Sequence, residues 1–176
     1  MAQLIPPVSS RDHIKGPRNV PVTLVEYGDY ECPYCGQGYW FVKDLEQSLG
    51  DLLCFAFRNF PLTNVHPHAE HAAEAAEASG AQGKFWEMHD CLFEHQQALH
   101  DRDLVEYAAG IGIDVALFIR EMTAHRYADQ VREDFLSGVR SGMNGAPTFF
   151  INGARYQGSL NLRSLLAAIE QVADEA

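Results

Sequence analysis

The chain of 176 residues suits one domain, or one domain that carries an insertion. Apolar residues make up 47% of it and charged residues 21%, a balance that predicts a soluble globular protein with a sizeable core. The formal net charge of −11 opposes binding to nucleic acid or to an anionic membrane surface, so we expect neither as a partner.

Residues 1–21 are predicted to form an N-terminal extension. They contain prolines and charged residues but no apolar segment of the kind found in a secretory signal. No apolar run in the chain approaches the ~20 residues that a membrane-spanning helix needs. If Met1 is the natural start, a cytoplasmic location is expected; removal of a leader would instead indicate the periplasm.

The next segments predict a strand, a helix and a second strand. Residues 22–27 are rich in β-branched side chains and predict a buried strand. Pro33 can begin a helix, and apolar residues then recur at helical spacing until Gly50. Residues 52–57 predict another buried strand. It should run parallel to the first, because a helix of about four turns separates them.

The middle of the chain has a different pattern. Residues 66–142 predict an all-helical block, with Asp101 and Asp114 expected as N-caps of two short helices. Residues 148–151 and 155–157 predict two further strands, joined by an Asn-Gly turn typical of a hairpin. An amphipathic helix is predicted after them. The fold class is therefore α/β, with an inserted all-helical domain.

Cys32 and Cys35 are the two of the four cysteines that lie close in sequence, and a Cys-x-x-Cys pair points to redox or metal chemistry. The pair opens the predicted helix, where free N–H groups and the positive end of the helix dipole stabilise a thiolate. Cys32 is expected at the N-cap, with its sulfur accepting from the N–H of Cys35. Cys35 should be more covered and resolve a mixed disulfide.

A metal site is the alternative that these residues leave open. Cys32 and Cys35 would supply zinc ligands together with His66 or His68, and His68 also shares a helix face with His71. A zinc site of this type would normally include a second Cys-x-x-Cys, which the sequence does not contain. The redox interpretation is therefore favoured.

Glu26 lies inside an apolar strand, six residues before Cys32. A buried carboxylate is costly unless it is paired or has a function, and near a thiol pair it can accept a proton from Cys35. Alternation that turns Glu26 to solvent, or pairing with Lys43 or Arg58, explains it equally well from the residues alone.

Other notable residues have ordinary structural interpretations. Cys54, Cys91, Trp40 and Trp86 are predicted to fill the core. Pro147 marks the start of a strand or an edge, and the base rate for its preceding peptide bond favours trans.

Taken together, several segments resemble the DsbA-like thiol–disulfide oxidoreductases of the thioredoxin superfamily, and in particular members without a leader. The similarity keeps the family's motif order over residues 11–172 and rests on segments 22–35 (VTLVEYGDYECPYC), 58–62 (RNFPL), 66–69 (HPHA), 82–86 (QGKFW) and 145–153 (GAPTFFING).

The resemblance implies a thioredoxin fold whose thioredoxin-like domain comprises residues 22–62 and 145–174. Residues 63–144 would form the inserted helical domain, which caps the active site. It further implies that Cys32 is an exposed nucleophile, that Cys35 resolves the mixed disulfide, and that Glu26 is a buried proton acceptor.

The same resemblance implies how substrate is held. The Ala146–Pro147 bond would be cis, in a loop that faces the cysteine pair, and Pro33 and Tyr34 would join this loop in contacting substrate. Partners would be protein or peptide thiols and disulfides, with glutathione or a redox protein for recycling, and neither a cofactor nor a metal is expected.

Two further points concern the type of oxidoreductase. Pro-Tyr between the cysteines, in place of the Pro-His of DsbA, implies a milder oxidant. A glutathione-dependent transferase or isomerase of the kappa type is a third alternative. That group has serine where this chain has Cys32, which argues against it.

Overall fold

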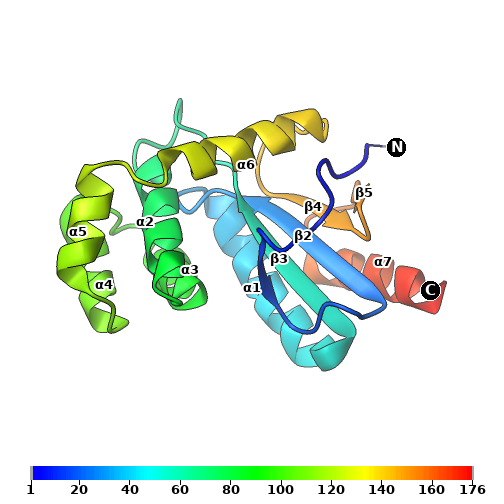
Figure 1. Cartoon of the computed structure of the whole chain (residues 1–176). Helices are drawn as coiled ribbons and strands as arrows, with labels where there is room; N and C mark the ends of the chain where they lie inside the picture. Colours follow the sequence, from blue (N-terminus) through cyan, green and yellow to red (C-terminus); the bar gives the residue numbers. More distant parts are fainter. Residues whose placement is uncertain (1, 176) are drawn as a thin grey trace.

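The computed structural model describes residues 2–175, and a five-stranded mixed sheet lies at its centre (Figure 1). The strand order is β1-β3-β2-β4-β5. β2 and β3 are parallel, whereas the other neighbouring pairs are antiparallel. The strands are β1 (His13–Lys15), β2 (Val22–Gly28), β3 (Leu53–Asn59), β4 (Thr148–Ile151) and β5 (Ala154–Arg155).

The helices follow the predicted order, and the α/β class with a helical insertion is confirmed. In Figure 1, α2 to α5 lie together beside the sheet, and α6 runs from them across it. None of the helices in residues 2–175 has the length and apolar character required to cross a membrane. They are α1 (Pro33–Leu49), α2 (Ala69–Ala81), α3 (Phe85–Glu94), α4 (Asp101–Gly110), α5 (Val115–Thr123), α6 (Ala128–Arg140) and α7 (Leu162–Asp174).

β2 and β3 are nearly continuous apolar runs because both faces of the sheet are covered. One face, which carries Leu24 and Phe55, belongs to a core cluster that includes Leu45 of α1 and Leu165 of α7. The other face carries Val25, in a second cluster under α6 and the N-terminal segment. Side chains alternate along β2, so the position of Glu26 lies on the same face as Leu24 and is directed toward α1.

The predicted N-terminal extension contributes a strand of its own. β1 pairs with β3 at the edge of the sheet, with Ile14 opposite Ala56. Nearer the N-terminus of the same segment, Leu4 is buried in the cluster under α6. Only three residues form β1, too few for a period-2 pattern to be recognised from sequence.

The inserted region is helical, as predicted, but its last helix also covers the sheet. α6 contacts β3, and Phe135 of α6 stacks on Phe60 with ring centroids 4.3 Å apart. Asp114 is the N-cap of α5, where its side chain accepts from the N–H of Leu117 at 2.9 Å. Asp101 is not a cap: it is the first residue of α4, and His100 occupies the N-cap position.

Two core predictions are wrong. Trp40 is 56% exposed, because the buried face of α1 passes through residues such as Tyr39 and Val42 and leaves Trp40 on the outer side. Cys91 is half-buried, whereas Cys54 is buried as predicted. Trp86 packs against the core from a half-buried position.

Candidate active site

The cysteine pair lies at the N-terminus of α1, directly after β2. Cys32 is the N-cap residue with extended backbone (φ −73°, ψ 123°), and Pro33 begins the helix, as predicted. Within residues 2–175 the Cys32 sulfur accepts no hydrogen bond of regular capping geometry, although the N–H groups of Tyr34 and Cys35 lie near enough to favour its thiolate. Cys35 is fully buried. Cys32 is 4% exposed, so the prediction of an exposed nucleophile is wrong in the reduced protein: the loop before β4, through Ala146, packs over it.

The two thiols differ strongly in acidity. The pKa of Cys32 is lowered to about 6, chiefly because the Cys35 thiol donates a hydrogen bond to its thiolate, and burial partly opposes this effect. The backbone N–H groups of Cys35 and Tyr34 lower it further. The pKa of Cys35 is raised well above its usual range, first by burial and then by the hydrogen bond to Cys32.

Glu26 lies on β2 beneath α1 and is 1% exposed. Burial, and secondarily the charge of Cys32, raises the pKa of Glu26 to about 8. The carboxyl fits because Gly38 of α1 lacks a side chain: a Cβ there would lie 3.3 Å from Oε1. Neither proposed salt-bridge partner reaches it, since Lys43 binds Asp90 at 3.0 Å and Arg58 binds Asp12 at 2.7 Å.

Asp29 holds the loop that leads into the cysteine pair, a function that the sequence analysis missed. Its side chain is buried, and Oδ1 accepts from the N–H groups of Glu31 (2.8 Å) and Cys32 (3.2 Å). Oδ2 accepts from the N–H of Leu62 at 2.8 Å and lies 2.8 Å from Nδ1 of His66. The backbone N–H of Asp29 donates to the sulfur of Cys35 at 3.3 Å. An aspartate three residues before a cysteine is a weak signal, because its partners near residue 62 are distant in sequence.

The histidines proposed as metal ligands have other partners. His66 binds Asp29, and His68 binds Glu31 with Nδ1 2.9 Å from Oε1. Within residues 2–175, neither histidine forms a metal-ligating group with Cys32 or Cys35. The metal alternative at the cysteine pair therefore has no geometric support.

The Ala146–Pro147 bond is cis, as the resemblance implied. The carbonyl oxygen of Ala146 lies 3.8 Å from the sulfur of Cys32 and can accept a hydrogen bond from it only while Cys32 is protonated. Tyr34 is 62% exposed beside the pair, and Pro33 is also exposed. The structure thus brings together at one surface all the residues predicted to contact substrate.

This arrangement combines a nearly buried thiol whose pKa is lowered to about 6, a fully buried thiol whose pKa is raised, and a buried carboxyl group whose pKa is raised to about 8. Such a set can attack a disulfide, resolve the resulting mixed disulfide and transfer the proton that resolution releases.

Comparison with known proteins shows the family of the chain. The family model described as thioredoxin matches residues 9–171. Over 166 residues the chain is 46% identical to a protein described as Na(+)/H(+) antiporter NhaA 1 from Salinispora arenicola, and over 168 residues it is 41% identical to Na(+)/H(+) antiporter NhaA from Herminiimonas arsenicoxydans. The matches cover 94% and 95% of this chain but 25% and 27% of those proteins, so the chain spans about a quarter of their length.

Solved structures share the whole fold. A thioredoxin-like oxidoreductase from Silicibacter pomeroyi has a TM-score of 0.82 at 25% identity, and 96% of this chain and 95% of that chain are covered. BdbD from Bacillus subtilis has a TM-score of 0.79 at 23% identity, with 92% of each chain covered. The thiol-disulfide exchange protein alpha-DsbA2 from Wolbachia pipientis has a TM-score of 0.80 at 21% identity, with 93% of this chain and 88% of that chain covered. The chain therefore belongs to the thioredoxin family, and its fold carries a helical insertion like that of the DsbA-type structures.

Proposed function

We propose that this chain exchanges disulfides with protein thiols through Cys32 and Cys35. The Cys32 thiolate attacks a substrate disulfide, forming a mixed disulfide and releasing one substrate thiolate. Cys35 then gives up its proton and attacks the sulfur of Cys32, which closes the Cys32–Cys35 disulfide and releases the second substrate thiolate. The substrate is reduced and the enzyme pair is oxidised; with an oxidised enzyme the same steps run in reverse.

Glu26 is the proton acceptor for the second step. While Cys32 is a thiolate, its charge helps to raise the pKa of Glu26 to about 8. That charge disappears when Cys32 enters the mixed disulfide, so the pKa of Glu26 falls. Burial, the larger cause, still raises it, and the ionised fraction of Glu26 takes the proton of Cys35 when this thiol attacks.

The opposite acidity of the two thiols is the observation that carries this proposal. A pKa of about 6 keeps Cys32 ionised at neutral pH, whereas burial keeps Cys35 protonated until it is needed. Two structural cysteines, or two metal ligands, would not require this asymmetry.

The acidity of Cys32 also bears on the direction of electron transfer between the enzyme and its substrate. A pKa near 6 lies between those of thioredoxin, about 7, and DsbA, about 3.5. We therefore expect a reduction potential between about −270 and −120 mV, the values of those two proteins. In a compartment buffered by glutathione at about −220 to −260 mV, such as the cytoplasm, a pair with a potential above that value is kept mainly reduced and acts as a reductase or isomerase.

Extended peptide segments are the proposed substrates. The backbone of Ala146 lies beside Cys32, where an extended strand can pair with it, and Tyr34 provides exposed aromatic surface next to the same sulfur. We further propose that the exchange activity resides in this chain itself and does not require the remaining three quarters that its longer relatives contain.

Insulin reduction by the isolated chain, with dithiothreitol as reductant, tests the proposal. Cys32→Ser should abolish turnover, and Cys35→Ser should accumulate a mixed disulfide on Cys32. A Cys54→Ser/Cys91→Ser double variant is the matched control and should retain activity. Full activity of the Cys32→Ser variant would refute the mechanism, and turnover of glutathione conjugates without insulin reduction would favour the kappa-type alternative.

A further inference from the structure

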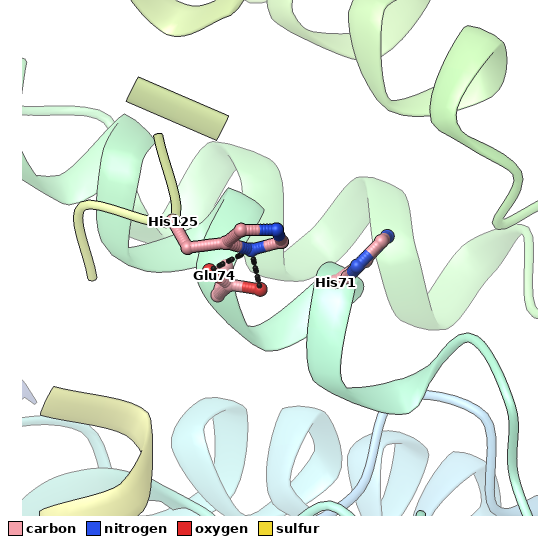
Figure 2. A group of neighbouring side chains, drawn as sticks. All are labelled: His71, Glu74 and His125. Atoms are coloured by element: carbon pink, nitrogen blue, oxygen red, sulfur yellow. Dashed lines mark hydrogen bonds and ion pairs between the residues drawn. The ribbon is translucent and has the colours of Figure 1, made fainter. Parts of the chain in front are cut away.

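A second cluster of reactive side chains lies in the helical insertion, on elements that do not carry the cysteine pair. His71 and Glu74 are three residues apart on α2, so they share one face of that helix. His125 comes from the turn between α5 and α6. Figure 2 shows the His125 ring over the Glu74 carboxylate, with His71 beside them. One ligand atom from each of the three residues lies within 4.8 Å of the others.

His125 and Glu74 already form a hydrogen-bonded pair, and the separation of their ligand atoms also suits two ligands of one metal ion. Nδ1 of His125 lies 3.1 and 3.3 Å from the two carboxylate oxygens of Glu74. Zinc binds nitrogen at about 2.0–2.1 Å and carboxylate oxygen at about 2.0–2.2 Å, so two ligands of a tetrahedral ion are about 3.3 Å apart. A nitrogen and an oxygen are therefore already at the separation that a shared ion needs.

Burial makes Glu74 an unusual member of the cluster. Its side chain is 2% exposed, whereas those of His71 and His125 are 45% and 56% exposed. A buried carboxylate is costly without strong partners, and a bound cation would supply one. The two histidines can adjust to an ion because they face solvent, while Glu74 provides a fixed base.

The backbone conformation of His125 also supports a metal site at these three residues. His125 has a positive φ of 49°, a left-handed conformation that is unfavourable for a residue other than glycine. This conformation holds the imidazole of His125 over Glu74, the arrangement seen in Figure 2. On the other side, Asp101 lies 3.0 Å from Nδ1 of His71 and orients that ring, as carboxylates beside metal-binding histidines do.

We propose that His71, Glu74 and His125 form a binding site for a divalent transition-metal ion, with Zn²⁺ as the best match. Two imidazoles and one carboxylate favour zinc over calcium or magnesium, which prefer oxygen ligands throughout. A three-residue set leaves a fourth position open. His71 and His125 also line a cavity of about 300 Å³ whose other walls include Leu104, Phe118 and Met122, so this position can take water or a small ligand.

The site is independent of the cysteine pair, and its occupation would join α2 to the turn between α5 and α6. Zinc should therefore stabilise the helical insertion whether or not the thiols are reactive. The test uses the full chain with Cys32→Ser and Cys35→Ser, so that the redox cysteines do not bind the added metal. In this background a failure of the metal proposal is distinct from a failure of the redox proposal.

Zn²⁺ titration by calorimetry should give one site per chain, and Co²⁺ should give the visible absorption of a four- or five-coordinate ion. Changing either His71→Ala or His125→Ala should weaken Zn²⁺ binding at least tenfold, and Glu74→Gln should do the same. His95→Ala, an imidazole in the same insertion but outside the cluster, is the matched control and should bind as tightly as the parent.

Because Glu74 is buried, the far-ultraviolet circular dichroism of its variant must match the parent before its affinity is compared; the exposed His71 and His125 variants decide the question if it does not. Zn²⁺ should also raise the thermal midpoint of the parent but not that of a His71→Ala/His125→Ala double variant. Absence of saturable one-to-one binding, or equal affinity in that double variant, would overturn the proposal.

Discussion

The side-chain amide of Gln96, in the segment between α3 and α4, donates hydrogen bonds to the carbonyl oxygens of Cys32 at 2.9 Å and Tyr30 at 3.0 Å. These residues are 64 and 66 positions apart from Gln96 in the chain. The inserted helical domain thereby holds the loop that presents the reactive cysteine, so the position of the nucleophile depends on the docking of the insertion.

Gln96→Ala should loosen this loop without removing any reacting atom. We expect disulfide exchange to slow several-fold and the alkylation rate of Cys32 to change, because two buried carbonyl groups lose a donor. Insulin turnover and iodoacetamide labelling measure the two effects. Gln97→Ala, at the exposed neighbouring position, is the matched control. Equal turnover of the Gln96 and Gln97 variants would show that the contact has no influence.

Gly36→Ala should disturb the same contact from the opposite side. A Cβ at Gly36 would overlap Oε1 of Gln96, so the Gln96 side chain must move away. The variant should therefore reproduce the effect of Gln96→Ala on turnover. In a Gly36→Ala/Gln96→Ala double variant the two effects should not add, which a double-mutant cycle tests. Full additivity would contradict a shared origin.

The acidity of Cys32 predicts a pH profile. Alkylation of Cys32 should follow a titration with a midpoint near pH 6, because the thiolate is the reactive form. Since folding lowers this pKa from 9.0, the thiolate stabilises the reduced protein fully above pH 9, and this stabilisation is lost as the pH falls through 6. Urea denaturation of the reduced wild type and Cys32→Ser should therefore diverge as the pH rises from 6 to 9. A labelling midpoint near pH 9 would contradict the assignment.

Glu26→Gln should stabilise the reduced protein while slowing resolution of a mixed disulfide. Folded Glu26 keeps its proton up to about pH 8, whereas the unfolded chain loses it near 4.5, so the wild type becomes less stable as the pH rises between these values. The gain in unfolding free energy of the Gln variant over the wild type should be small below pH 4.5 and on the order of 5 kcal/mol above pH 8. Urea denaturation across this range measures it, with exposed Glu106→Gln as control. A pH-independent difference would mean that Glu26 titrates normally.

Asp29→Ala should destabilise the protein by about 2–4 kcal/mol, because the N–H groups of Glu31 and Leu62 lose their side-chain acceptor and that of Cys32 keeps only the backbone carbonyl of residue 29. Asp29→Asn is the milder variant: it keeps an oxygen for the loop but removes a negative charge that raises the pKa of Cys32. In the Asp29→Asn variant, the midpoint of Cys32 alkylation should therefore shift to lower pH. A shift in the other direction would show that loop geometry, and not charge, dominates.

The sequence by itself determined the order of the elements and the location of the cysteine pair. The β-branched run of β2, Pro33 at the helix start and the Asn-Gly turn before β5 are local signals, because each acts through residues a few positions away. The boundaries of β3 and the existence of the short β1 could not be predicted well from the sequence, since both depend on pairing with a strand elsewhere in the chain.

Only the tertiary structure decided the environment of the site. From the sequence, Glu26 had three interpretations of similar weight. The packing of α1 on β2, with Gly38 of α1 facing the Glu26 side chain, showed that the carboxyl group is buried. Gln96 is positioned by contacts across more than 60 residues of chain, and His125 meets Glu74 across 51. Sequence periodicity records which face of an element is buried, but not which distant side chain meets it there. The acidity of the thiols and the shape of both candidate sites follow from those long-range contacts.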